Sequence, residues 1–193
     1  MKAKIIFSTG IAFGLFTGWY LFPFALYSST EQPLHFSHAT HTGESAGMAC
    51  EDCHSTLENG RFQGIPAVAK CAECHAAPLG DSESEKILVE EYITPNKEIP
   101  WLVYSRQPDN AYFSHAPHTT LGEMKCESCH GPHGSSELLR PHQVNRISGY
   151  SRDIWGANIF GFSTTSWVGM KMDKCVRCHA DYGRRDGCIA CHK

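Results

Sequence analysis

The residues of this sequence that could do chemistry are cysteines and histidines at one fixed spacing. A Cys-x-x-Cys-His pattern occurs five times and uses all ten cysteines of the 193-residue chain. The occurrences are Cys50-Glu-Asp-Cys53-His54, Cys71-Ala-Glu-Cys74-His75, Cys126-Glu-Ser-Cys129-His130, Cys175-Val-Arg-Cys178-His179 and Cys188-Ile-Ala-Cys191-His192. Two cysteines three residues apart can bond to both vinyl groups of one haem, and the following histidine can then bind its iron. The pattern predicts five covalently bound haem c groups. Their predicted proximal ligands are His54, His75, His130, His179 and His192.

Other sites also use closely spaced cysteines. Zinc sites contain Cys-x-x-Cys pairs but do not require a histidine after each pair. Iron–sulfur sites have other spacings, and thioredoxin-like motifs come singly. Five patterns with no cysteine left over favour haem attachment over these alternatives.

Seven further histidines could bind the distal side of the irons: His35, His38, His41, His115, His118, His133 and His142. Five irons need five distal ligands, so every haem can be bis-histidine, which predicts low reduction potentials. Saturated irons favour electron transfer, so no catalytic residue is predicted. The histidines suffice without methionine ligands. The two in excess could serve a sixth haem held without a cysteine pair, or lie on the surface.

One segment of the sequence is repeated. Phe36-Ser-His-Ala-Thr-His41 precedes the first motif, and Phe113-Ser-His-Ala-Pro-His118 precedes the third. This pattern resembles the small multihaem cytochromes of sulfate- and metal-reducing bacteria.

That resemblance implies a ligand assignment. The first histidine of each repeat would bind the haem of the following motif, so His38 would serve the haem of His54 and His115 that of His130. The second histidine of each repeat would reach a neighbouring haem and join the haems into one cluster.

The N-terminus carries an uncharged run of 24 residues, Ile5–Ser28. This run is long enough to span a bilayer as a helix, and Lys2 and Lys4 before it favour a cytoplasmic N-terminus. We therefore expect residues 1–30 to form a single-pass anchor in the inner (cytoplasmic) membrane, with the haem domain in the periplasm. The alternative is a cleaved signal peptide.

The remaining chain divides by its motifs. Residues 31–80 form a predicted haem module with two motifs, 81–110 a connector, and 111–193 a module with three motifs. The expected fold class is mainly α and irregular: one transmembrane helix and a small multihaem cytochrome c domain with little or no sheet. Short helices would carry the motifs.

The connector also carries a group of acidic residues. They form either a solvated face or a docking patch for a basic redox partner. These residues are Asp81, Glu83, Glu85, Glu90 and Glu91.

The whole arrangement, with repeats that follow Glu98-Ile-Pro-Trp101, resembles the multihaem subunit of menaquinone reductase (Qrc) complexes of sulfate-reducing bacteria. The pentahaem subunit of alternative complex III is related. The resemblance implies an electron-transfer subunit that is no enzyme on its own. It would take electrons from a soluble tetrahaem cytochrome and pass them to partner subunits, namely iron–sulfur, molybdopterin-family-like and integral membrane proteins, toward menaquinone.

Three alternatives stay open. The first is a subunit of alternative complex III, in which electrons run outward from quinol. The second is a quinol dehydrogenase of the NapC/NrfH type, but that family usually has methionine where this chain has Thr56. The third is a haem enzyme with an open axial position, such as a small-oxyanion reductase. The net charge of −3 and the lack of a basic patch argue against nucleic-acid binding.

Overall fold

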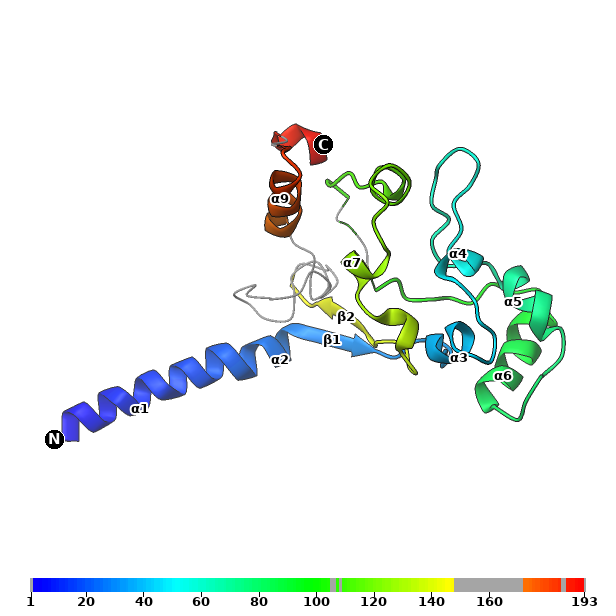
Figure 1. The fold of residues 1–193 in the computed structure, drawn as a ribbon. Coiled ribbons are helices and arrows are strands. Elements are labelled where there is room, and N and C mark those ends of the chain that lie inside the picture. Colours follow the sequence, from blue (N-terminus) through cyan, green and yellow to red (C-terminus); the bar gives the residue numbers. More distant parts are fainter. Residues whose placement is uncertain (1, 105–106, 108, 148–171, 185–186, 193) are drawn as a thin grey trace.

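The computed structural model describes residues 2–104, 107, 109–147, 172–184 and 187–192. Short helices and irregular segments make up most of it, with one small sheet (Figure 1). The elements are α1 (Lys2–Phe16), η1 (Thr17–Leu21), α2 (Phe22–Leu26), β1 (Tyr27–Thr30), α3 (His38–Thr42), α4 (Cys50–Cys53), α5 (Val68–His75), α6 (Glu83–Ile87), η2 (Leu88–Ile93), η3 (Pro117–Leu121), α7 (Glu127–His130), η4 (His133–Ser135), β2 (His142–Asn145), α9 (Met172–Asp181) and α10 (Cys188–Cys191). The expected mainly α and irregular fold class is confirmed.

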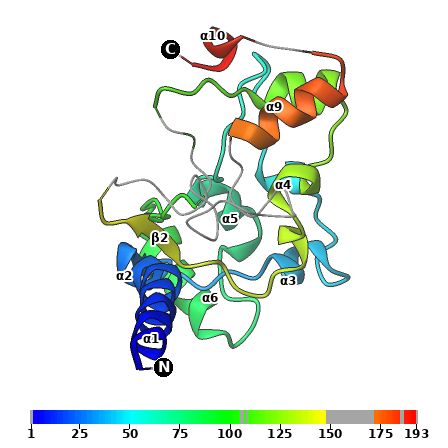
Figure 2. The same ribbon diagram turned by 90° about the vertical axis from the view of Figure 1, so that its left-hand side faces the viewer.

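The N-terminal helix α1 stands away from the other elements in Figure 1 and is seen nearly end-on in Figure 2. It has 15 residues, which extend about 22 Å against a bilayer core of about 30 Å. The apolar run then passes through the π-helical turn η1 and the short helix α2, and its last two residues, Tyr27 and Ser28, belong to strand β1. Within the described residues, no helix combines the length and apolarity needed to cross a membrane. The expected single-pass anchor in the inner membrane is therefore wrong.

The sheet joins the N-terminal segment to a distant part of the chain. Strands β1 and β2 pair antiparallel, from Tyr27 opposite Asn145 to Thr30 opposite His142. The Ser28 hydroxyl also donates to the carbonyl of Val144 at 3.4 Å. Two strands of four residues agree with the expectation of little sheet.

A small apolar core lies beside the second motif. This core cluster consists of Leu34, Val68, Leu88, Tyr92 and Ile99. It packs helix α5, which carries the motif, against η2 of the connector. The Glu98 carboxylate also accepts a hydrogen bond from the Val68 N–H at 2.9 Å. The second motif is therefore held against residues 83–99. The division at residues 80 and 110 stays a prediction, and part of 111–193 lies outside the described residues.

Every motif lies on or at the end of a short helix, as predicted: α4, α5, α7, α9 and α10. In the first motif the His54 N–H donates to the Cys50 carbonyl at 2.8 Å, and in the fifth the His192 N–H donates to the Cys188 carbonyl at 3.0 Å. Residues three and four apart share one face of a helix. One helical turn therefore directs both cysteines and the histidine of a motif to the same side.

Candidate haem sites

The cysteines of different motifs lie close to one another. All ten fall within the described residues, and all are unbridged thiols. At each of four of them, burial is the main cause of a raised pKa, and a thiol of another motif raises it further. The neighbours are Cys71 with Cys53, Cys50 with Cys126, Cys129 with Cys178, and Cys175 with Cys191. The proximity of these thiols places the motifs in one series, in the order second, first, third, fourth and fifth.

A cavity opens between the first and third motifs. Its volume is about 500 Å³, and its lining includes Cys50 of α4, Cys126 before α7, and Thr119 and Met124 of the segment between them. The cavity places open space directly beside the cysteines that would carry two haems.

The two Phe-Ser-His-x-x-His repeats adopt the same side-chain arrangement. The Phe36 ring stacks on His41 with ring centres 4.5 Å apart, and Phe113 stacks on His118 at 4.8 Å. Each phenylalanine also meets the first histidine of its repeat edge-on, with ring centres 4.9 Å apart in both repeats. The phenylalanine thus holds both imidazoles of its repeat in place.

Backbone carbonyls within the repeats orient the second histidines. The Nδ1 atom of His41 lies 2.8 Å from the Ser37 carbonyl oxygen, and Nδ1 of His118 lies 2.8 Å from that of Ser114. A carbonyl can only accept, so each imidazole donates from Nδ1. The unprotonated Nε2 of each ring is then the atom able to bind iron.

Two proximal histidines have the same kind of contact over longer distances along the chain. Nδ1 of His54 donates to the Gly64 carbonyl at 2.8 Å, and Nδ1 of His192 donates to the Asn110 carbonyl at 3.2 Å. Histidines that bind metals commonly donate their other N–H to a carbonyl or carboxylate, which fixes the orientation of the ring. The loops around residues 64 and 110 therefore complete the first and fifth motifs.

The first histidine of the first repeat is oriented by a hydroxyl. Nδ1 of His38 lies 3.2 Å from the Ser136 Oγ, and this hydroxyl donates its own hydrogen to the His133 carbonyl at 2.7 Å. The hydroxyl can therefore only accept from His38, which again protonates Nδ1 and leaves Nε2 for iron. This contact also ties α3 to η4.

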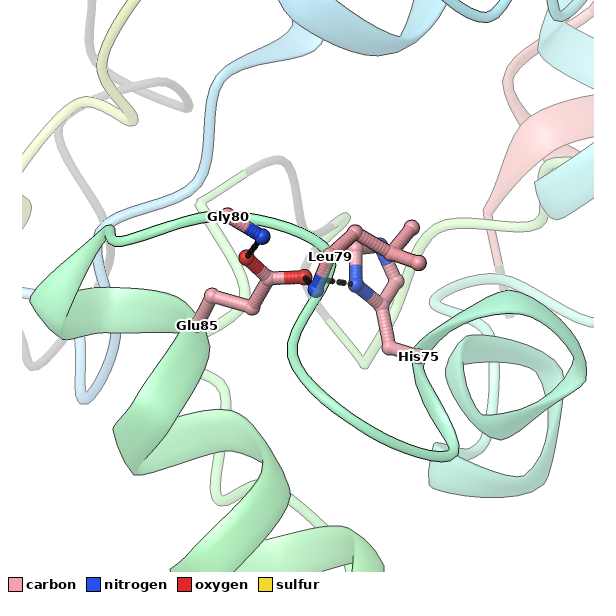
Figure 3. A network of polar contacts seen from close by, with 4 residues as sticks. All are labelled: His75, Leu79, Gly80 and Glu85. Carbon is pink, nitrogen blue, oxygen red and sulfur yellow. Dashed lines mark hydrogen bonds and ion pairs between the residues drawn. The ribbon is translucent and has the colours of Figure 1, made fainter.

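The proximal histidine of the second motif contacts a carboxylate instead. Nδ1 of His75 lies 2.6 Å from Oε1 of Glu85, at the start of α6 (Figure 3). The side chains are 20% and 13% exposed, so water has little access to this pair. Glu85 therefore differs from Asp81, Glu83, Glu90 and Glu91, the other acidic residues of its group, which lie at exposed positions.

Several imidazoles face each other at the spacing that two ligands of one iron require. Bonds from imidazole to a transition metal are about 2 Å long, so two imidazoles on opposite sides of an iron have ring centres roughly 6 Å apart. Ring centres are 6.1 Å apart for His41 and His75, 6.1 Å for His118 and His179, and 6.3 Å for His115 and His130. Each pair joins a repeat histidine to a motif histidine. The donor set therefore fits bis-histidine haem c.

The surroundings of the first histidine in each repeat favour the neutral form that binds iron. Burial lowers the pKa of His38, and His54 and His41 lower it further. Burial likewise lowers the pKa of His115, with His130 and His118 adding to the effect. The first histidine of each repeat thus lies near the motif that follows it, as the sequence resemblance implies.

The other three distal candidates differ in their surroundings. His133 lies with its ring centre 6.3 Å from that of His38, and burial, followed by the charge of Arg140, lowers its pKa to about 4. His35 is exposed, and His142 pairs with Thr30 in the sheet. In the described part of the chain, neither His35 nor His142 lies beside a motif histidine.

Comparisons with known proteins agree with this site. Residues 45–186 match the profile of outer membrane cytochrome MtrC/MtrF-like domains II/IV. The chain is 39% identical, over 202 aligned positions covering 97% of it and 89% of the relative, to the multihaem cytochrome c subunit of menaquinone reductase from Nitratidesulfovibrio vulgaris strain Hildenborough. The chain belongs to this family of multihaem cytochromes c. It is therefore an electron-transfer protein with covalently bound haem c rather than a catalyst on its own, as expected. The number of haems stays a prediction from the motifs.

Sequence reasoning missed the groups that orient the imidazoles of this cytochrome. Four of these groups are backbone carbonyls, which any residue would supply, so the sequence carried no signal for them: those of Ser37, Ser114, Gly64 and Asn110. The role of Glu85 was hidden because the sequence shows only an acidic residue among others.

Proposed function

We propose that this multihaem cytochrome accepts electrons from a soluble low-potential cytochrome and relays them to partner subunits of a menaquinone-reducing complex. The observation that carries the proposal is that three motif histidines each face a repeat histidine at the spacing of paired axial ligands. The relative named as a subunit of menaquinone reductase covers nearly the whole chain and supports it.

The three imidazole pairs suggest an axial ligand for three of the irons, and the electrostatic influence of His54 on His38 suggests a fourth. We assign His38 to the iron bound by His54, His41 to that of His75, His115 to that of His130, and His118 to that of His179. The second histidine of each repeat then serves a different motif from the first. The distal ligand of His192 is proposed to come from His133, His142 or His35.

Haem c, when bound, supplies a one-electron carrier at each motif. The residues of this chain hold it and set its properties. The cysteines attach it covalently, and the contacts at Nδ1 hold the imidazoles in a fixed orientation and raise their basicity. Two imidazoles per iron leave no position for a substrate and favour low potentials, because they stabilise the oxidised state more than a methionine ligand does.

The partners follow from the family. We propose that the donor is a soluble tetrahaem cytochrome and that the acceptors include iron–sulfur, molybdopterin-family-like and integral membrane subunits. The chain has a net charge of −3 before the haem propionates are counted. This charge would attract a basic donor, so the rate of the encounter should fall as ionic strength rises.

Affinity isolation of the tagged holo-protein from its native host, with identification of the co-purifying subunits, tests the proposal. Membrane and iron–sulfur subunits should co-purify, and a reduced low-potential cytochrome should reduce the complex before a menaquinone analogue becomes reduced. Recovery of the lone cytochrome would contradict the role as a subunit. Reduction of the haems by a quinol analogue, with no transfer to the quinone, would instead support a quinol-oxidising complex.

A further inference from the structure

Glu85 makes three hydrogen bonds that fix its carboxylate beside His75 (Figure 3). Oε1 accepts from the Leu79 N–H at 2.8 Å as well as from Nδ1 of His75 at 2.6 Å. Oε2 accepts from the Gly80 N–H at 3.0 Å. The turn between α5 and α6 thus folds around the carboxylate and leaves it one orientation.

The surrounding core keeps Glu85 and His75 together. Glu85 lies on α6, which continues directly into η2, where Leu88 and Tyr92 are buried. These two residues belong to the core cluster together with Val68 of α5, the helix that ends at His75. Both ends of the contact are therefore anchored on the same packed elements.

The charge of Glu85 distinguishes His75 from other proximal histidines. His54 and His192 donate to neutral backbone carbonyls, whereas His75 donates to a carboxylate. Glu85 also accepts hydrogen bonds from the N–H groups of Leu79 and Gly80, and three donors around one carboxyl group favour its charged form. A hydrogen bond to an anion is stronger than one to a neutral acceptor.

An anionic acceptor changes the electron donation of the imidazole. Partial withdrawal of the Nδ1 proton makes the opposite nitrogen, Nε2, a stronger donor to iron. A stronger donor stabilises the ferric state over the ferrous state, and a nearby negative charge in a poorly hydrated site acts in the same direction. Both effects lower the reduction potential.

We propose that Glu85 is a positioning residue that lowers the reduction potential of the haem attached at Cys71 and Cys74. The inference rests on the proposed function, because it requires haem at this motif with His75 as its ligand. The haem of the second motif would then be more reducing than that of the first motif, because His54 donates to a neutral carbonyl. Groups that orient metal ligands through hydrogen bonds commonly change the metal affinity or the activity of a site by tenfold or more. A tenfold change in the ratio of reduced to oxidised haem corresponds to about 59 mV.

Redox titration of the holo-protein, followed in the visible haem bands, tests the proposal with Glu85→Gln. This variant keeps the size of the side chain and removes its charge. One component should move to a higher potential by about 59 mV or more. Glu83→Gln is the matched control, because Glu83 lies on the same helix with a side chain that is 79% exposed and pairs with Lys86. No shift in Glu85→Gln, or an equal shift in Glu83→Gln, overturns the proposal.

A variant without the second attachment site identifies the component that moves. In Cys71→Ala/Cys74→Ala, the haem content should fall by one, and the component lost should be the one that Glu85→Gln shifts. An unchanged haem content would contradict the proposed haem attachment itself. Survival of the shifted component would contradict only the role of Glu85.

A second measurement leaves Glu85 in place and applies if Glu85→Gln fails to retain its haems. The component lost in Cys71→Ala/Cys74→Ala should then have a more negative potential than the component lost in Cys50→Ala/Cys53→Ala. This order is expected because His54 donates to a neutral carbonyl. The reverse order overturns the inference.

Discussion

Replacement of His41 by alanine tests the pairing of imidazoles across the fold. The His41 ring centre lies 6.1 Å from that of His75, and Phe36 and the Ser37 carbonyl hold the ring in place. Without His41, the iron bound by His75 loses its distal ligand and should become high-spin. With five motifs in the chain, about one fifth of the low-spin ferric EPR intensity should disappear, because one iron in five changes its ligation. The remaining irons should keep their signals.

The matched control lies in the same segment. His35 is exposed and has no ring contact with His75 among the described residues, so His35→Ala should leave the low-spin signal of the iron bound by His75 unchanged. The decisive comparison adds His41→Ala to Cys71→Ala/Cys74→Ala. In that background His41→Ala should create no high-spin iron, because the haem that it serves is already absent. A new high-spin signal there would refute the pairing of His41 with His75.

Three further predictions concern attachment, orientation and packing. Cys188→Ala/Cys191→Ala should reduce the haem content measured as pyridine haemochrome by one per chain, and an unchanged content would exclude attachment at the fifth motif. Ser136→Ala removes the hydroxyl that accepts from Nδ1 of His38, which should reduce the free energy of unfolding by about 1 kcal/mol; denaturant titration checks this, and unchanged stability would count against the contact. Leu88→Ala removes a side chain that is 9% exposed in the core cluster, which should cost about 2–5 kcal/mol in the same assay, and a loss below this range would show that the cluster does not pack α5 against η2.

The haem-attachment chemistry could be predicted from the sequence because it is local. Two cysteines and a histidine within five residues share one helical turn, so their spacing alone directs them to one side. The structure places all five motifs on short helices, as this reasoning requires. The repeats are equally local, and each one stacks its phenylalanine on its own second histidine.

The N-terminal run shows where local reasoning failed. Hydropathy counts apolar residues and takes no account of the partners that their backbone finds. The last residues of the run pair with β2, which is more than a hundred residues away in the chain, and helix α1 at the start of the run ends at Phe16. Strand pairing is a long-range contact, so the sequence of the run could not indicate it.

The sequence by itself determined which residues attach haem and which histidines are available as ligands. Only the tertiary structure decided which imidazoles face each other, as with His41 and His75, and in what order the motifs follow one another. It also decided which group accepts the hydrogen bond from Nδ1: a carbonyl for His54 and a carboxylate for His75. The physical reason is that spacing along the chain sets geometry only within a turn or two of helix. Contacts between distant segments depend on how the whole chain packs.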